Sequence, residues 1–321
     1  MGGAGRGPVS RRADRSSGLA PIVLLLTVGV AACDRGSAPL TEPDLPNHAY
    51  TGLPGMPSTI ELDEGRWNGE AFQPGGASRP SVTLLPDFRV RGDLGGDGRA
   101  DVVAVLATNS GGSGELVHAV VLSDSGSGWT QSGLALLGDR VQVRGGRIAG
   151  GSLLLDVVEA GPNDAACCPG RVLTRGWRFA ADGEFEEFDP GLPETRLNWS
   201  LLGGSSWVLR SWGRNEPAAE SPDIILRAEA GTVSGRGGCN QYRGGVEDGS
   251  APGEITIGEL AVTRMACPEP RMADERRYLD QLRGAVKFGF FGGRLALSYR
   301  DGERGWDRML FESGTVPPAA Q

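Results

Sequence analysis

Five cysteines are the residues whose chemistry is most restricted in this chain: Cys33, Cys167, Cys168, Cys239 and Cys267. A thiol can carry a lipid, form a disulfide or bind a metal ion, and its surroundings decide which. The chain has only two histidines, His48 and His118, and neither lies at the spacing of a zinc site. Lipid attachment and disulfides are therefore the first chemistry to consider.

Cys33 follows a segment with the composition of a secretory signal. Residues 1–18 carry four arginines, and residues 19–32 are apolar but shorter than the roughly 20 residues that span a bilayer. The letters VAAC at residues 30–33 resemble the lipobox of bacterial lipoproteins. That resemblance implies cleavage before Cys33 and diacylglycerol, with acyl chains such as palmitate, on its thiol. An ordinary signal peptide followed by an unrelated cysteine is the alternative.

The sequence thus predicts a signal peptide over residues 1–32 and a protein held at a membrane of the bacterial cell envelope by the lipid on Cys33. Whether this is the inner or the outer membrane stays open. Residues 33–57 are rich in Pro, Gly and Ser and have no apolar period, which is typical of a flexible tether.

Net charge argues against nucleic acid as a partner. The chain carries −8, and residues 1–32 contribute four Arg and one Asp, so residues 33–321 carry about −11. An acidic body repels phosphate backbones, and no basic stripe with interleaved aromatic residues is present.

Residues 58–190 show the pattern of a β domain. Short segments rich in Val, Leu and Ile alternate with Gly, Asp, Asn and Ser turns, and no segment has a helical period. The strands expected here cover residues 81–94, 100–109, 115–124, 139–148 and 152–161.

Three carboxylates in this region stand at positions one, five and nine of a short loop: Asp93, Asp97 and Asp101. The loop resembles the calcium loops of dockerins and FG-GAP repeats, in which alternate carboxylates converge on one hard cation. Gly95 stands where those families place an Asp or Asn ligand, and the twelfth position is Ala104 rather than Glu. Ca²⁺ is the one cofactor predicted, and an Asp-Gly turn between two strands is the alternative.

Cys167 and Cys168 are adjacent and lie in the sequence GPNDAACCP. In an exported protein they can pair with each other, pair elsewhere or bind metal. We predict a structural disulfide staple, with redox or metal chemistry as the alternatives.

The carboxy-terminal region, residues 199–314, carries motifs in a specific order. They are LGGSSWVL at 202–209, VSGRGGCNQY at 233–242, ITIG at 255–258 and TRMACP at 263–268, followed by residues 275–282 and 295–297. This order resembles the META domain, the family of the heat-shock protein HslJ. The region before it resembles the uncharacterised β domain that precedes META domains in some bacterial lipoproteins.

The strand pattern of this region agrees with a small barrel or sandwich containing a single helix. The expected strands cover residues 207–212, 223–230, 232–238, 254–263, 286–293, 294–300 and 307–313. Pro270 suits the first turn of the helix, and apolar side chains lie near one of its faces: Met272, Tyr278, Leu279, Leu282 and Val286. The fold class predicted for the whole chain is mainly β, with two small β domains after the signal peptide and tether.

The resemblance marks seven residues as the family motif: Gly238, Cys239, Asn240, Thr263, Met265, Cys267 and Pro268. Cys239 and Cys267 lie in its two most specific parts, and in an oxidising envelope they are expected to pair. Closing a loop of about 28 residues would contribute roughly 3–4 kcal/mol. Two buried free thiols are the alternative.

The functional prediction is a lipid-anchored envelope module that binds a protein, a peptide or a cell-wall ligand, in connection with stress. An inhibitor or scaffold of an envelope enzyme, like the lysozyme-inhibitor lipoproteins, is the alternative. An enzyme is not expected, because the sequence has no GxSxG motif, no cluster of histidine ligands and no phosphate loop. A thiol protease also fails, because residues 199–314 contain no histidine.

Overall fold

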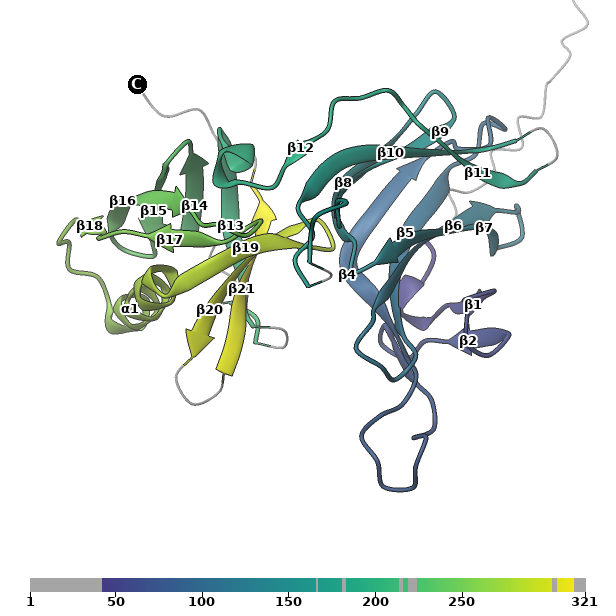
Figure 1. Cartoon of the computed structure of the whole chain (residues 1–321), viewed down its shortest axis with the longest axis horizontal. Helices are drawn as coiled ribbons and strands as arrows, with labels where there is room; N and C mark the ends of the chain where they lie inside the picture. Colours follow the sequence, from purple (N-terminus) through teal and green to yellow (C-terminus); the bar gives the residue numbers. More distant parts are fainter. Residues whose placement is uncertain are drawn as a thin grey trace, which may run out of the picture. The chain divides into compact units, whose positions relative to one another are not determined.

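The computed structural model describes the chain over residues 42–165, 167–180, 183–213, 216–218, 224–301 and 305–314, apart from the side chains of residues 86, 87 and 301 (Figure 1). The predicted signal peptide, Cys33 and the start of the predicted tether lie outside these residues. The described residues belong to one compact unit. Within the described part of the chain, no helix combines the length and apolar character needed to cross a bilayer.

The fold is mainly β, as predicted, and the sheets that precede residue 197 are antiparallel. A two-stranded sheet pairs β1 with β2, one larger sheet has the order β3-β4-β5-β6-β7, and another has β11-β10-β9-β8 with β12 beside β10. The elements are η1 (Leu45–Asn47), β1 (Ala49–Thr51), β2 (Thr59–Glu61), β3 (Arg66–Asn68), β4 (Ser81–Gly92), β5 (Asp101–Asn109), β6 (Leu116–Asp124), β7 (Trp129–Asp139), β8 (Gln142–Ala149), β9 (Ser152–Glu159), β10 (Arg171–Phe179), β11 (Phe185–Phe188) and β12 (Thr195–Arg196).

Strand β5 explains why its sequence, DVVAVLATN, is apolar without alternation. Successive side chains of a strand point to opposite faces. Val103 and Val105 enter one apolar core, whereas Val102 and Leu106 enter another, so both faces of the strand are buried. A strand covered on both faces reads as a continuous apolar run.

The sheet after residue 204 is a nearly closed barrel. Its order is β17-β16-β15-β14-β13-β21-β20-β19, with β18 beside β16. An isolated bridge between Glu254 and Lys287, and a hydrogen bond of 2.8 Å from Phe288 N to Gly253 O, bring the two ends together. The elements are η2 (Trp199–Leu202), β13 (Ser205–Trp212), β14 (Ile224–Glu229), β15 (Thr232–Gly237), β16 (Gln241–Asp248), β17 (Ile255–Ile257), β18 (Ala261–Val262), α1 (Glu269–Arg283), β19 (Ala285–Phe291), β20 (Arg294–Asp301) and β21 (Gly305–Ser313).

The predicted helix is α1, which contacts β15 and β20. Pro270 lies in its first turn, and the side chains that it buries are Glu275, Tyr278, Leu279 and Leu282. Three of these are apolar or aromatic, as the spacing predicted. Val286 is not on the helix, because Gly284 ends α1 and the chain then enters β19.

The predicted tether is wrong for residues 42–57, which belong to the fold. Leu45, Tyr50 and Leu53 are buried in the same core as Val102, and the Tyr50 hydroxyl donates a 2.9 Å hydrogen bond to Leu45 O. The few apolar side chains between the prolines are enough to bury this segment. The division of the chain into two β domains stays a prediction, although different sheets hold the strands before residue 197 and those after residue 204.

Candidate functional site: a disulfide-stapled loop

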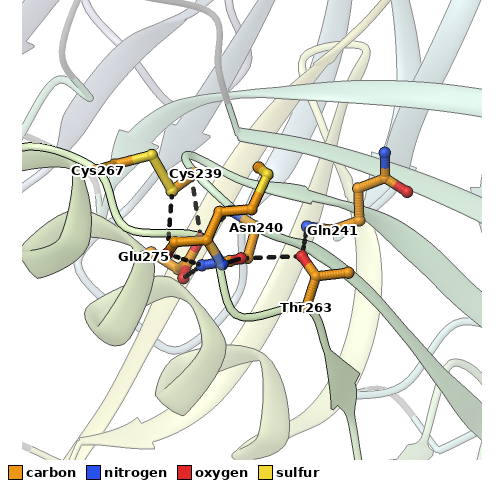
Figure 2. The surroundings of a disulfide bond; sticks show 7 residues. Cys239, Asn240, Gln241, Thr263, Cys267 and Glu275 are labelled. Atoms are coloured by element: carbon orange, nitrogen blue, oxygen red, sulfur yellow. Dashed lines mark hydrogen bonds between the residues drawn. A yellow bond between two sulfur atoms is a disulfide. The ribbon is translucent and has the colours of Figure 1, made fainter.

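The two halves of the predicted family motif meet beside the amino-terminal half of α1. Cys239 precedes β16 and Cys267 precedes α1, and their sulfurs lie 2.00 Å apart with Cα atoms separated by 6.0 Å (Figure 2). The pair therefore lies at disulfide distance, as the resemblance implied. We call residues 263–268 the TRMACP loop; this bond fixes its carboxy-terminal end.

Two glycines allow the backbone to approach the helix before Cys239. Gly238 has φ +116°, in the region that L side chains rarely adopt. A Cβ on Gly237 would lie only 3.1 Å from Cγ of Glu275. A side chain at 237 would therefore crowd α1, and one at 238 would strain the backbone, which is why Gly suits both positions before Cys239.

Asn240 is buried and links the TRMACP loop to the helix. Its Oδ1 accepts hydrogen bonds from the Thr263 hydroxyl at 2.9 Å and from Met265 N at 2.7 Å. Its Nδ2 donates to Glu275 Oε1 at 2.8 Å and to Met265 O at 3.4 Å. Figure 2 shows Asn240 between Thr263 and Glu275. The side-chain amide thus holds two loop residues and one helix residue at once.

Glu275 is the central residue of the cluster; it opens the 275–282 segment of the motif order but is not among the seven motif residues. It is only 4% exposed, and its Oε2 accepts hydrogen bonds from the backbone N–H groups of Cys239, at 3.1 Å, and Asn240. Such amides offset part of the cost of burying a carboxylate. The sequence did contain a signal, because Glu275 shares a helix face with Tyr278, Leu279 and Leu282 at the spacing i, i+3, i+4 and i+7.

Two tyrosines anchor the helix to the barrel below this cluster. The hydroxyls of Tyr242 and Tyr278 lie 2.6 Å apart, and the Tyr242 hydroxyl donates to Ile225 O at 3.2 Å. Burial raises the pKa of both phenols, so they stay neutral. The helix that supplies Glu275 is therefore fixed from two sides.

The TRMACP loop is exposed although its backbone is held from below. Thr263, Arg264, Met265 and Ala266 are all exposed, with Met265 at 51%. Thr263 N donates to Gln241 O at 3.0 Å, and Gln241 N donates to the Thr263 hydroxyl at 3.1 Å. All seven motif residues are brought together, and their common effect is to present a fixed segment to solvent.

Cys167 and Cys168 do not form the predicted disulfide. Both carry free thiols, Cys167 exposed and Cys168 half-buried. Cys168 instead contacts a side chain that the prediction did not consider: Lys287 Nζ lies 3.3 Å from Cys168 Sγ and donates a hydrogen bond to it.

The three carboxylates of residues 93–101 are engaged by the loop itself. Asp93 accepts hydrogen bonds from Gly96 N at 2.6 Å and Gly98 N at 3.0 Å, and buried Asp101 accepts one from Leu94 N at 2.7 Å. In the described residues no group of three or more His, Cys, Asp or Glu side chains is arranged to hold a metal ion. Calcium binding at this loop stays a prediction.

A cavity of about 410 Å³ lies away from the motif. Its walls combine apolar side chains with charges of both signs, among them Leu85, Phe88, Leu310, Arg89 and Glu115. This volume is within the range of small-molecule sites. None of the seven motif residues lines it.

The carboxy-terminal part of the chain is thus a nearly closed antiparallel barrel with one helix and a disulfide-stapled loop. Residues 200–307 match the META domain family, so this part of the chain is a META domain of the HslJ-like kind. An NMR structure of a protein from Burkholderia xenovorans is 26% identical over 40% of this chain and 97% of that chain, with a TM-score of 0.31. No curated protein matches the chain.

This assignment bears on function at a coarse level. The META domain indicates a stress-related or envelope-associated module. It is not a known enzyme family.

Proposed function

We propose that the protein is a lipid-anchored, non-enzymatic module of the bacterial envelope that binds another envelope protein through the TRMACP loop. The observation that carries this proposal is that the loop is exposed while Asn240, Glu275 and the disulfide hold its backbone. A segment already ordered before binding loses little conformational entropy when a partner covers it, which favours affinity.

A lipid on Cys33 would hold the folded part of the chain, and the TRMACP loop with it, at a membrane. The proposed lipid is on Cys33, and Glu42 is the first described residue. Nine residues reach at most about 30 Å when fully extended. A folded part tethered within that distance of the lipid would meet its partners near the membrane surface.

The polar cluster beneath the loop supports binding over catalysis. The side-chain amide of Asn240 and the carboxylate of Glu275 are occupied by hydrogen bonds within the cluster. Cys239 and Cys267 are paired with each other. These groups stabilise the loop and are not directed at a substrate.

A photo-cross-linker at position 265 of the full chain in living cells tests the docking proposal. The same group at position 306 is the matched control, because Trp306 is also exposed, at 62%, and is not part of the loop. We expect one defined cross-linked protein from position 265. An excess of wild-type chain should compete for it, and a Met265→Asp chain should not. Equal cross-links from both positions would contradict docking through the loop.

The anchor has its own test. Cys33→Ser should move the protein from the membrane fraction to the soluble fraction and abolish labelling by a fatty-acid analogue. Labelling that persists in this variant would show that Cys33 is not the lipidated residue.

An inhibitor of an envelope enzyme is the second candidate, and the observation that favours it is Met265. Its unbranched side chain projects from a fixed, exposed segment, and such a side chain can occupy the substrate cleft of an enzyme. The full chain should then slow lysozyme hydrolysis of cell walls in a saturable way, and Met265→Asp should remove that effect. If the wild type does not inhibit lysozyme, the inhibitor proposal is wrong and docking of an envelope protein is the remaining proposal for the loop.

A further inference from the structure

A second chemical site lies between β9 and β10, where Cys167 and Cys168 are adjacent free thiols. The flanking backbone is held by Asp164, whose Oδ2 accepts hydrogen bonds from Gly161 N at 2.8 Å and Gly170 N at 2.9 Å. The Arg196 guanidinium donates two more hydrogen bonds to this carboxylate, at 3.0 and 2.6 Å. The two thiols are therefore carried by a segment that is fixed on both sides.

The two thiols have different surroundings. Lys287, the one lysine of the chain, places its Nζ 3.3 Å from Cys168 Sγ. The hydrogen bond from Cys167 and the Lys287 ammonium lower the pKa of Cys168. The same hydrogen bond raises the pKa of Cys167, which is the exposed thiol of the pair. Cys168 is thus the better thiolate, and Cys167 is a protonated neighbour within reach of it.

We propose that Cys167 and Cys168 form a thiol–disulfide exchange site that reduces low-molecular-weight disulfides. The Cys168 thiolate attacks one sulfur of the disulfide R–S–S–R, forms a mixed disulfide and releases R–S⁻. Cys167 then loses its proton to water, attacks the sulfur of Cys168 and releases the second R–S⁻. Two electrons pass from the cysteine pair to the substrate, and the pair ends as a disulfide.

Three features separate this site from the stapled loop. The first is the adjacency of the two thiols, which makes the second step intramolecular. The second is the cation, because the chain places its one ammonium against Cys168. The third is access: Cys167 is exposed and Cys168 is half-buried, whereas Cys239 is fully buried.

The test uses the detergent-extracted full chain and the aromatic disulfide 5,5′-dithiobis(2-nitrobenzoate) as the probe. We expect two thiolates to be released for each chain, and mass spectrometry of a non-reduced digest should show Cys167 linked to Cys168 without retained probe. Cys167→Ser should stop after one release, with the probe bound to Cys168. A wild-type chain that keeps probe on both cysteines, or stops at the mixed disulfide, would overturn the proposal.

Lys287 gives the matched comparison for the first step. Lys287→Met should slow the first release roughly twofold to threefold: about 1 kcal/mol of charge stabilisation changes the thiolate fraction roughly fivefold, and the higher nucleophilicity of the more basic thiolate offsets part of that loss. Lys287→Arg should restore most of the rate. The pH dependence of the wild-type rate is a readout that needs no variant, and its midpoint should lie below that of a free cysteine. Equal rates for Lys287→Met and wild type, or a midpoint at the free-cysteine value, would remove the role assigned to the ammonium.

Discussion

The META domain and the β region before it are stabilised by different interactions. The META domain has one core, a covalent staple and a buried carboxylate that accepts backbone amides. The preceding region has two cores that share β5 and β6, and its cysteines are free. Both regions are expected in the same compartment, so the state of each cysteine pair depends on the local structure more than on the environment.

This difference has a consequence for how each region responds to stress. The META domain depends on a bond that reductant can break. The preceding region depends on apolar packing, and it buries a histidine, His118, at 0% exposure, where burial favours the neutral form. We therefore expect redox conditions to affect mainly the first and acid mainly the second.

The largest effect should come from removing the staple. Replacing both Cys239 and Cys267 with Ser should lower the free energy of unfolding by roughly 3–4 kcal/mol, because the bond closes a loop with a sequence separation of 28. Urea unfolding of the full chain measures the loss. The matched control replaces both Cys167 and Cys168 with Ser, which should cost less than about 1 kcal/mol. Equal losses for the two pairs would break the comparison between the regions.

His118 should make the preceding region sensitive to acid. Its Nε2 lies 3.1 Å from the Thr108 hydroxyl, Nδ1 has no partner among the described residues, and burial lowers its pKa to about 4. Because the pKa is lower in the folded state, the stability is complete above pH 6.5 and is lost as pH falls towards 4. The loss should be about 2 kcal/mol by pH 5 and about 3 kcal/mol by pH 4.

His118→Gln keeps a hydrogen-bond donor for Thr108 and cannot titrate, so it should remove most of this pH dependence. His48→Gln is the control. Burial lowers the pKa of His48 too, but the charge of Asp44 opposes that shift, so this variant should change the pH dependence less. The measurement is the free energy of unfolding of wild type and both variants, from unfolding curves recorded between pH 7 and pH 5. A loss in the His118 variant as steep as that of wild type would mean that another group causes the acid sensitivity.

The sequence allowed more of the fold than of the site to be predicted. Strands such as β5 and β20 were found because their apolar patterns are strong. β16 was missed because its sequence, QYRGGVED, is polar and contains two glycines, and only its pairing with β15 and β17 makes it a strand. β7 and β10 were missed for a similar reason, because charged or polar residues interrupt both.

The contacts within the site depend on residues far apart in the chain. Motif order identified Cys239, Asn240 and Cys267, and the structure brings them together. Lys287 follows Cys168 by 119 positions and reaches it because β19 lies at one end of the barrel sheet. Glu275 follows Asn240 by 35 positions. Contacts between residues so far apart in the sequence follow from the topology of the fold, and a local sequence pattern does not predict them.

Glu275 offers a smaller perturbation than loss of the disulfide. Glu275→Gln keeps one acceptor, but its new NH2 group must face either the backbone N–H groups of Cys239 and Asn240 or the Asn240 Nδ2 donor, so we expect a loss of about 2 kcal/mol. Glu269→Gln on the same helix is the control, because that carboxylate is exposed. Hydrogen exchange in residues 263–268 should accelerate in the first variant and not in the second. Unchanged exchange in both would show that the disulfide alone orders the loop.

The smallest effect concerns calcium at residues 93–101, and it compares two carboxylates in one loop. Buried Asp101 accepts hydrogen bonds from Leu94 N and from the Ser123 hydroxyl, whereas the Asp97 side chain accepts one within the described part of the chain, from Arg99 N at 2.8 Å. Asp101→Ala should therefore destabilise the region in any buffer, and Asp97→Ala should matter only with calcium. At ten times the Kd, Ca²⁺ would contribute about 1.4 kcal/mol, which raises the melting temperature of the wild type by a few degrees. The measurement is a melting curve in millimolar CaCl₂ or chelator for wild type and both variants. Identical wild-type curves in the two buffers would leave the loop as a turn closed by its own amides, with no role for the cation.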